Sequence, residues 1–177
     1  MYEGMSSELP KVGWCKFVWN RLTVPKHRFI LWLASHDRLK TRTRLHKMGI
    51  GCDQLCPVCG NNDETVKHLF CDCTFSASCA ASLLHWLGLH CTKSDMGQIM
   101  IWIRRSCKGD FRRKVAYTTM ASLVYHIWRA KNTAVWDMTV PTFQTTVQRV
   151  QSDVKCRVQN LISKSVKQSD RDWFSSL

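Results

Sequence analysis

Acidic residues are scarce in this 177-residue chain, in which 13 Asp and Glu oppose 26 Lys and Arg. Polymerases and nucleases of the reverse transcriptase and RNase H type hold divalent metal ions with clustered carboxylates. No Asp-Asp pair stands at the end of a strand pattern here, so we expect a protein that is not an enzyme. The adjacent Ser35, His36 and Asp37 do not alter this expectation, because a catalytic triad is assembled in space and not along the chain.

Long apolar runs and strand patterns are also missing. The longest apolar run covers residues 29–34, whereas roughly 20 residues are needed to span a bilayer. The first ten residues contain Glu3 and Glu8 and lack the apolar centre of a signal peptide. The 10 cysteines are partly scattered, which suits a reducing compartment. We therefore expect an intracellular protein, nuclear or cytoplasmic, that has no membrane partner.

Apolar residues recur at helical spacing through most of the chain, and no segment alternates as a strand does. The fold is predicted to be mainly α. Helices are expected over residues 11–22, 25–35, 41–49, 76–87, 95–109 and 110–136, with an amphipathic segment after Pro141. Thr41 is expected to cap the third helix, Ser94 or Asp95 the fifth, and Asp110 the sixth.

For the second and third of these helices, the apolar pattern predicts which side chains are buried and which face water. In the helix over residues 25–35, the apolar face is expected to consist of Phe29, Trp32 and Leu33. In the helix over residues 41–49, we expect Leu45 and Met48 to be buried, while its basic residues Arg42, Arg44 and Lys47 face water.

A metal-binding pattern follows these two helices. Cys56, Cys59, His68 and Cys73 follow the spacing C-x2-C-x8-H-x4-C. Thiolates and imidazole are the donors that tetrahedral zinc prefers, and a Cys-x-x-Cys turn brings two sulfurs close enough to share one ion. Pro57 stiffens this turn and Gly60 allows tight backbone geometry after it. The pattern predicts one structural zinc ion. The mainly α fold is therefore expected to be a small helical domain with a zinc-stapled Cys-Cys-His-Cys loop and a C-terminal helical extension.

Other uses of these cysteines are less well supported. A redox Cys-x-x-Cys motif belongs with a βαβ pattern, which is not present, and a disulfide framework belongs in secreted proteins. The spacing leaves the fourth ligand open. His68 and Cys71 are three residues apart and share a helical face, so Cys71 could replace Cys73. Cys52 also lies close to Cys56.

Positive charge is concentrated beside the metal pattern rather than on it. Residues 11–50 contain ten Lys and Arg against the single acid Asp37, whereas residues 51–75 are net acidic. Such clustering favours contacts with phosphates, although a solvated helix face is the simpler alternative. The residues expected to bind RNA or DNA are Lys26, Arg28, Arg38, Lys40, Arg42, Arg44 and Lys47.

The stretch from Trp14 to about residue 89 resembles a known family. It contains Cys56-Pro57-Val58-Cys59-Gly60, then Glu64-Thr65, and then His68-Leu69-Phe70 followed by Cys73. This order is similar to the zinc-binding domain downstream of the reverse transcriptase in plant LINE-type retroelements. The resemblance implies that Cys56, Cys59, His68 and Cys73 are the zinc ligands and that Cys71 is a spare.

The resemblance and the charge pattern together give an expected organisation and function. A reverse-transcriptase-type zinc-binding domain is expected over residues 11–90 and a helical extension over residues 91–177. The chain is expected to be a non-enzymatic retroelement module that binds RNA or DNA, with a reverse transcriptase domain as its ancestral neighbour. The alternatives are a protein-interaction scaffold, in which zinc only stabilises the fold, and a non-functional retroelement fragment.

Overall fold

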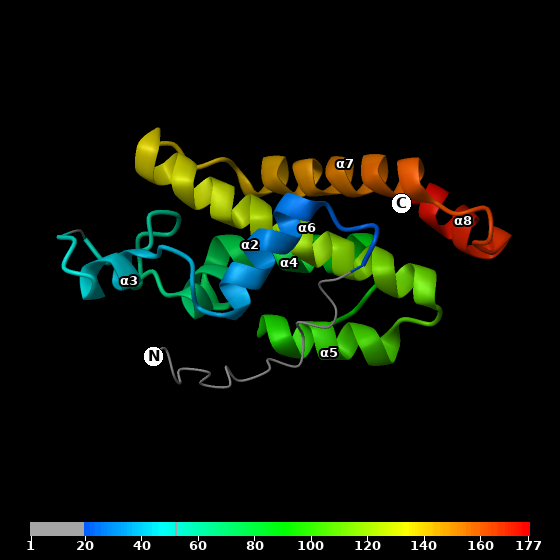
Figure 1. The fold of residues 1–177 in the computed structure, drawn as a ribbon, viewed down its shortest axis with the longest axis horizontal. Coiled ribbons are helices and arrows are strands. Elements are labelled where there is room, and N and C mark those ends of the chain that lie inside the picture. The colour runs from blue at the N-terminus through cyan, green and yellow to red at the C-terminus, as the bar shows by residue number, and fades with distance from the viewer. Residues whose placement is uncertain (1–19, 52) are drawn as a thin grey trace, which may run out of the picture.

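The computed structural model describes residues 20–51 and 53–177, and helices account for most of them (Figure 1). In these ranges the β-type pairing consists of one isolated bridge, between Leu55 and Asp63. The predicted mainly α fold is therefore confirmed. The helices in chain order are α2 (Pro25–Ser35), α3 (Arg42–Lys47), the π-helix η1 (His68–Asp72), α4 (Thr74–Trp86), α5 (Met96–Ser106), α6 (Asp110–Trp136), α7 (Phe143–Leu161) and α8 (Gln168–Ser175).

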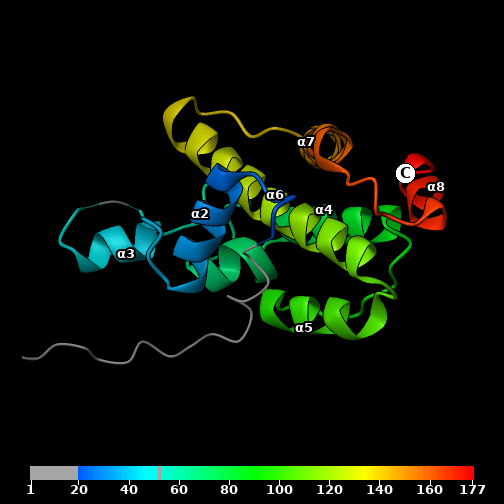
Figure 2. The same ribbon diagram turned by 45° about the vertical axis from the view of Figure 1, so that its right-hand side comes forward.

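The longest helix, α6, is the axis against which the others pack. Its 27 residues span about 40 Å at 1.5 Å per residue. It contacts α2, α4, α5, α7 and η1, and Figures 1 and 2 show α7 and α5 on opposite sides of it. Because neighbours surround the middle of α6, residues 115–124 are all buried. None of the helices in the described part of the chain is long and apolar enough to cross a bilayer.

Local sequence signals set where these helices begin. The Asp95 side chain accepts a hydrogen bond from the backbone N–H of Gln98 at the start of α5, and Thr142 caps α7 in the same way. The expected cap of α6, Asp110, is instead the first helical residue. Gly109 occupies the cap position with a φ of +96°, which favours glycine.

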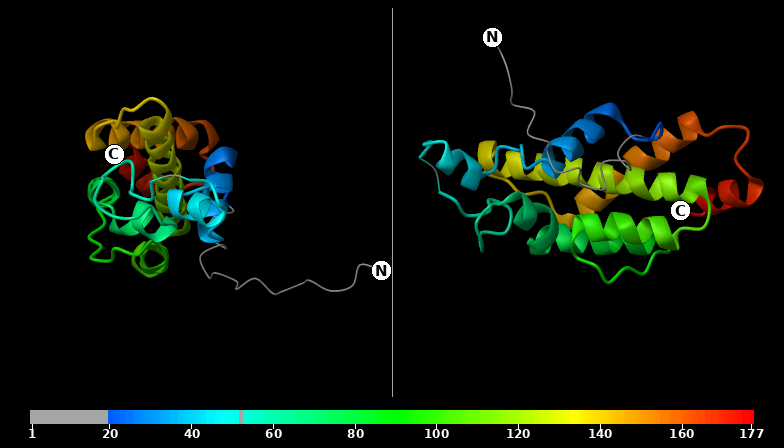
Figure 3. Two further views of the ribbon diagram at one scale, coloured as in Figure 1. Left: turned by 90° about the vertical axis from the view of Figure 1, so that its left-hand side faces the viewer. Right: turned by 60° about the horizontal axis from the view of Figure 1, so that its bottom comes forward.

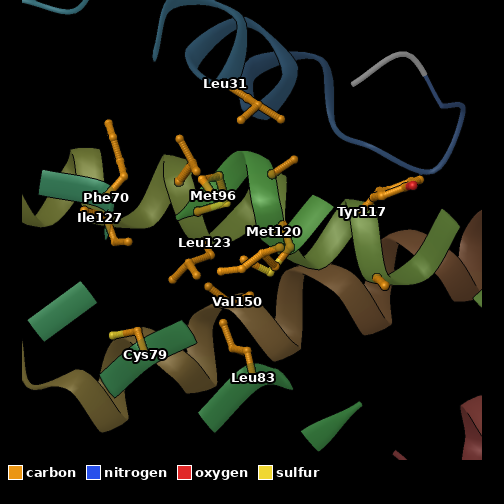
Figure 4. Packing of buried hydrophobic residues seen from close by; sticks show 14 of the residues in the cluster. Leu31, Phe70, Cys79, Leu83, Met96, Tyr117, Met120, Leu123, Ile127 and Val150 are labelled. Atoms are coloured by element: carbon orange, nitrogen blue, oxygen red, sulfur yellow. The ribbon is translucent and has the colours of Figure 1, made fainter. Parts of the chain in front are cut away.

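One continuous cluster of buried apolar side chains unites the N-terminal and C-terminal parts of the fold. Figure 4 shows its centre, where side chains from α2, η1, α4 and α7 surround α6; the labelled members include Leu31, Phe70, Leu83, Met120, Leu123, Ile127 and Val150. Residues on both sides of position 90 contribute to this cluster. The expected division into 11–90 and 91–177 stays a prediction.

The expected apolar face of α2 was wrong. The helix buries His27, Leu31 and Ala34 against α6, while Phe29 is 58% exposed. The pattern failed because the buried stripe contains a histidine and an alanine. Phe29, Trp32 and Leu33, which were expected to form the buried face, lie partly or mostly in solvent.

The third expected helix has its predicted start but not its predicted burial. Thr41 takes the cap position of α3, yet the helix has no buried residue and Met48 is 62% exposed. This short helix lies at one end of the molecule (Figures 1 and 3), where few apolar neighbours can cover it. The expected helix over residues 11–22 lies mostly outside the described residues, and α8 was not predicted.

Candidate metal centre

The first two candidate ligands, Cys56 and Cys59, lie in a tight loop closed by backbone hydrogen bonds. The Glu64 N–H donates to the Gln54 carbonyl at 2.7 Å, and the Cys56 N–H donates to the Asn62 carbonyl at the same distance. Gly60 donates to the Cys56 carbonyl at 2.8 Å and has a φ of +71°. Since this conformation strains residues with a Cβ, glycine after the second cysteine is required by the turn.

The other two candidates, His68 and Cys73, lie at the two ends of one short helical turn. The Thr65 hydroxyl accepts a hydrogen bond from the His68 N–H at 2.9 Å and so fixes the entry to this turn. At its exit the Cys73 N–H donates to the His68 carbonyl at 2.8 Å. The wide π-helical turn η1 therefore holds the histidine close to the cysteine that follows it.

The structure brings all four predicted ligands together. One donor atom from each of Cys56, Cys59, His68 and Cys73 lies within 4.8 Å of the others, and the Cys59 Sγ is 3.2 Å from the His68 Nε2. A tetrahedral zinc ion places its ligand atoms roughly 3.5–4 Å apart, so three sulfurs and one imidazole nitrogen at this spacing fit zinc. Cys56, His68 and Cys73 are buried, and Cys59 is half-buried.

The cluster is electrostatically prepared for a cation. A hydrogen bond with Cys56 and the backbone amides of Ser76 and Phe75 together lower the pKa of the Cys73 thiol to about 5, against the opposing effect of burial. The same hydrogen bond and burial raise the pKa of Cys56. The lowered pKa of Cys73 favours its thiolate form. Thiolate is the form in which cysteine binds metals.

The two spare cysteines have different positions. Cys71 does not belong to the cluster: its Sγ accepts a hydrogen bond from the Met96 N–H at 3.4 Å, and it lines a hollow with Leu31 and Val124. Burial raises the pKa of its thiol. This geometry favours Cys73 as the fourth ligand, in agreement with the resemblance. Cys52 lies outside the described residues.

A buried ion pair, which the sequence pattern did not reveal, anchors the loop that carries Cys56 and Cys59 to α6. We call this loop, residues 53–64, the metal loop. Glu64 ends the loop and is fully buried, and its Oε1 lies 3.6 Å from the Nζ of Lys131 on α6. The Arg42 N–H donates to the other carboxylate oxygen at 3.2 Å. Lys131 also donates to the Lys40 carbonyl at 3.1 Å. Burial raises the pKa of Glu64, while Lys131 and Arg42 oppose this effect.

The predicted nucleic-acid-binding residues lie on α2, on α3 and on the connection between them. Most are exposed: Lys26, Arg38, Lys40, Arg44 and Lys47. Arg28 is half-buried. Arg42 was expected to face water, but its guanidinium bonds the Asp53 carboxylate at 3.1 Å and the Leu55 carbonyl at 2.9 Å. Arg42 therefore joins α3 to the metal loop, because the Asp53 carboxylate and the Leu55 carbonyl lie within reach of its guanidinium.

The fold and the four clustered donors define a helical protein with a Cys3His metal site. Residues 1–79 match the family model for zinc-binding in reverse transcriptase. The match supports a reverse-transcriptase-associated zinc-binding domain in this part of the chain, and with the donor set it indicates zinc. The match ends inside α4, so α5 to α8 lie beyond it. No curated protein and no solved structure matches the chain.

Removing the metal is expected to loosen the loop before the helices. Residues 59–63 lack fully buried side chains, so a metal bound to Cys59 would be the main side-chain contact that holds this segment in place. With a chelator present, amide hydrogen exchange at Cys56, Gly60 and Glu64 should rise at least roughly 100-fold. The amides in the middle of α6 should keep their protection, because their hydrogen bonds and packing do not involve the metal. Equal protection of the loop with and without chelator would contradict this expectation.

Proposed function

We propose that this protein is a non-enzymatic module that binds RNA or DNA through a basic surface beside a structural zinc site. We define the basic surface by its exposed cations: Lys26, Arg38, Lys40, Arg44 and Lys47. The observation that carries the proposal is their concentration on two neighbouring helices and one short connection. Asp37 is the single acidic residue in residues 11–50, so it offsets only one of these positive charges. Phosphate contacts need such cations and give affinity without reading the base sequence.

Zinc has a structural role in this proposal. Four protein donors fill a tetrahedral shell, so no position is left for a reacting water molecule. The Cys3His site fixes the loop whose Asp53 and Leu55 hold Arg42. By this route the metal also fixes α3 and the cations on it. The family match supports an origin in a reverse-transcriptase polyprotein, and we propose a plant LINE-type retroelement as its source.

An exposed aromatic ring, Phe29, and the half-buried Trp32 beside the cations favour a single-stranded partner. Phe29 and Trp32 on α2 stack with ring centroids 6.2 Å apart, and the Arg38 guanidinium lies 5.8 Å from the Trp32 ring centroid. Phe29 is more than half exposed. Aromatic side chains next to a basic groove are the means by which proteins stack unpaired bases without sequence preference.

The test is a binding titration with fluorescein-labelled single-stranded RNA and DNA of mixed sequence across a range of salt concentrations. Affinity should fall steeply with salt, with a log–log slope of about −0.7 for each phosphate contact. The double variant Lys40→Ala/Lys47→Ala should make the slope shallower by about 1.4 and weaken all sequences alike. Phe29→Ala should weaken binding about tenfold without changing the slope, since stacking releases no counterions.

A matched control removes the same charge elsewhere. Lys164 and Lys167 are exposed and precede α8, which lies at the opposite end of the molecule from α3 (Figure 1). Lys164→Ala/Lys167→Ala should leave the slope unchanged. Equal effects of both double variants would mean that net charge, and not this surface, governs binding.

A protein-interaction scaffold is the second candidate, favoured by apolar residues that are exposed at the end of α6 and just after it. Trp136 and Met138 are the most exposed large apolar side chains in the described part of the chain. Contacts with another protein, such as a reverse transcriptase domain, would cover them. If the parent protein binds neither RNA nor DNA at low salt, the scaffold function is supported and the nucleic-acid function is wrong.

A further inference from the structure

A second group of metal-binding side chains lies where α2, α6 and α7 meet, and it shares no residue with the Cys3His cluster. His27 comes from α2, His126 from α6 and Asp153 from α7. One donor atom from each lies within 4.8 Å of the others. The Asp153 Oδ2 is 2.8 Å from the His126 Nε2 and 3.6 Å from the His27 Nε2. Three helices distant in sequence thus direct two imidazoles and one carboxylate to one point.

His27 is the unusual member of this group. Its side chain is 1% exposed, and neither ring nitrogen has a hydrogen-bond partner. The ring packs against Tyr125 with centroids 4.4 Å apart. Buried polar groups in folded proteins are nearly always hydrogen-bonded, so a histidine without a partner needs an explanation. A metal ion bound to Nε2 would provide one.

The donor set and its exposure suit a transition metal with an open position. Two neutral imidazoles and one carboxylate bind zinc and similar divalent ions, and three protein ligands leave coordination positions for water. The Asp153 side chain is 40% exposed, so an ion can reach the group from solvent. His126 also lines a hollow of about 200 Å³ together with Arg129 and Arg149.

The charges around the group both raise and lower the pKa values of its two histidines. Burial, with smaller effects from His126 and Lys26, lowers the pKa of His27 to about 4 against the opposing effect of Asp153. Burial also lowers the pKa of His126; Arg129 and Arg149 act in the same direction, and Asp153 opposes them. Both imidazoles are therefore neutral at physiological pH, which is the form that binds metals. The positive charges of Lys26, Arg129 and Arg149 weaken the attraction of this group for a divalent ion. We therefore expect weaker metal binding here than at the Cys3His cluster.

We propose that His27, His126 and Asp153 form a second metal site, which binds one Zn²⁺ and leaves part of its coordination shell to water. The ion joins α2, at the start of the described chain, to the α6–α7 pair. This proposal does not depend on nucleic-acid binding.

The test uses the full chain with its first site filled by zinc, titrated with Co²⁺ and followed by absorption spectroscopy. The wild-type protein should bind one further equivalent with weak d–d bands and without the thiolate-to-cobalt charge-transfer band, because the ligands are nitrogen and oxygen. Metal analysis after saturation with Zn²⁺ should give two ions per chain. A wild-type protein that stops at one ion would overturn the proposal.

Variants locate the second ion. Asp153→Asn and His27→Gln should each lose the second equivalent while keeping the first zinc. His85→Gln is the matched control, because His85 lies near His90 with ring centroids 6.3 Å apart and this pair could bind metal at the surface. The control should keep both ions. If His85→Gln loses the second ion, or if Asp153→Asn keeps it, the ion is bound elsewhere and the proposal is wrong.

A stability measurement covers the case in which His27→Gln folds poorly. Excess Zn²⁺ should raise the melting temperature of the zinc-loaded wild-type protein, since an ion that binds the folded state alone stabilises it. Asp153→Asn changes a partly exposed side chain and should fold, yet its melting temperature should not respond to the added metal. A response equal to that of the wild type would contradict the assignment.

Discussion

Replacing Cys73 by serine is expected to abolish zinc binding and to unfold the metal loop. Cys73 is fully buried, and backbone amides at the start of α4 support its thiolate form. A serine hydroxyl at this position is a poor zinc ligand. Structural zinc contributes roughly 10–16 kcal/mol to the folding of small zinc domains, which is as large as the whole net stability of a typical domain. We therefore expect Cys73→Ser to hold no zinc in the Cys3His site and to lose amide protection in the metal loop, while the amides in the middle of α6 keep theirs.

The neighbouring cysteine provides the control for this experiment. The Cys71 sulfur contacts the Met96 N–H and apolar side chains and takes no part in the cluster. Cys71→Ala should keep one zinc in the Cys3His site and cost about 1–2 kcal/mol, because a small buried side chain and one weak hydrogen bond are lost. If zinc is lost from Cys71→Ala and retained by Cys73→Ser, the fourth ligand has been assigned to the wrong cysteine.

The candidate ligands could be predicted because the information is local. Cys56 and Cys59 are three residues apart, and the turn between them has a definite geometry that Gly60 permits. His68 and Cys73 lie at the two ends of one helical turn. Helix ends marked by proline, by a capping side chain or by a glycine were predictable for the same reason. The bounds of α2 agree with the sequence prediction, and the cap of α5, Asp95, is one of the two residues expected there.

Features that join distant parts of the chain could not be predicted. Packing against α6 determines which face of α2 is buried, and the sequence of residues 25–35 alone does not indicate that His27 points inward. The role of Arg42 depends on Asp53 and Leu55 in another segment. Likewise, the grouping of His27 with His126 and Asp153 requires knowledge of how three helices pack. A helix pattern gives periodicity but does not identify the partner.

Lys131→Met should be among the most destabilising single substitutions outside the metal cluster. The Glu64 carboxylate is completely buried, and the Lys131 side chain that faces it is 6% exposed. Removing the lysine charge leaves a buried carboxylate without its counter-ion, a change that costs about 3–5 kcal/mol. Lys131 also holds the Lys40 carbonyl and lies 4.8 Å from the Trp128 ring centroid. Denaturant unfolding should show this loss at neutral pH.

The loss should depend on pH in a definite direction. Burial already raises the pKa of Glu64, and Lys131 opposes that rise, so Lys131→Met raises this pKa further. A carboxyl group whose folded-state pKa exceeds its unfolded value binds more protons when folded, so its contribution to stability falls as pH rises. The destabilisation by Lys131→Met should thus be greatest at neutral pH and shrink as pH falls toward the ordinary glutamate range. A constant loss across this range would show that the charge of Glu64 is not its cause.

Two further variants separate the buried pair from lysine loss in general. Glu64→Gln/Lys131→Met removes both charges and should recover much of the stability that Lys131→Met loses, because no uncompensated charge remains. Lys114→Met is the matched control on the same helix. Lys114 pairs with the exposed Asp110, and surface ion pairs contribute about 0–1 kcal/mol. If the Lys131 and Lys114 variants lose equal stability, the Glu64–Lys131 pair does not anchor the metal loop to α6.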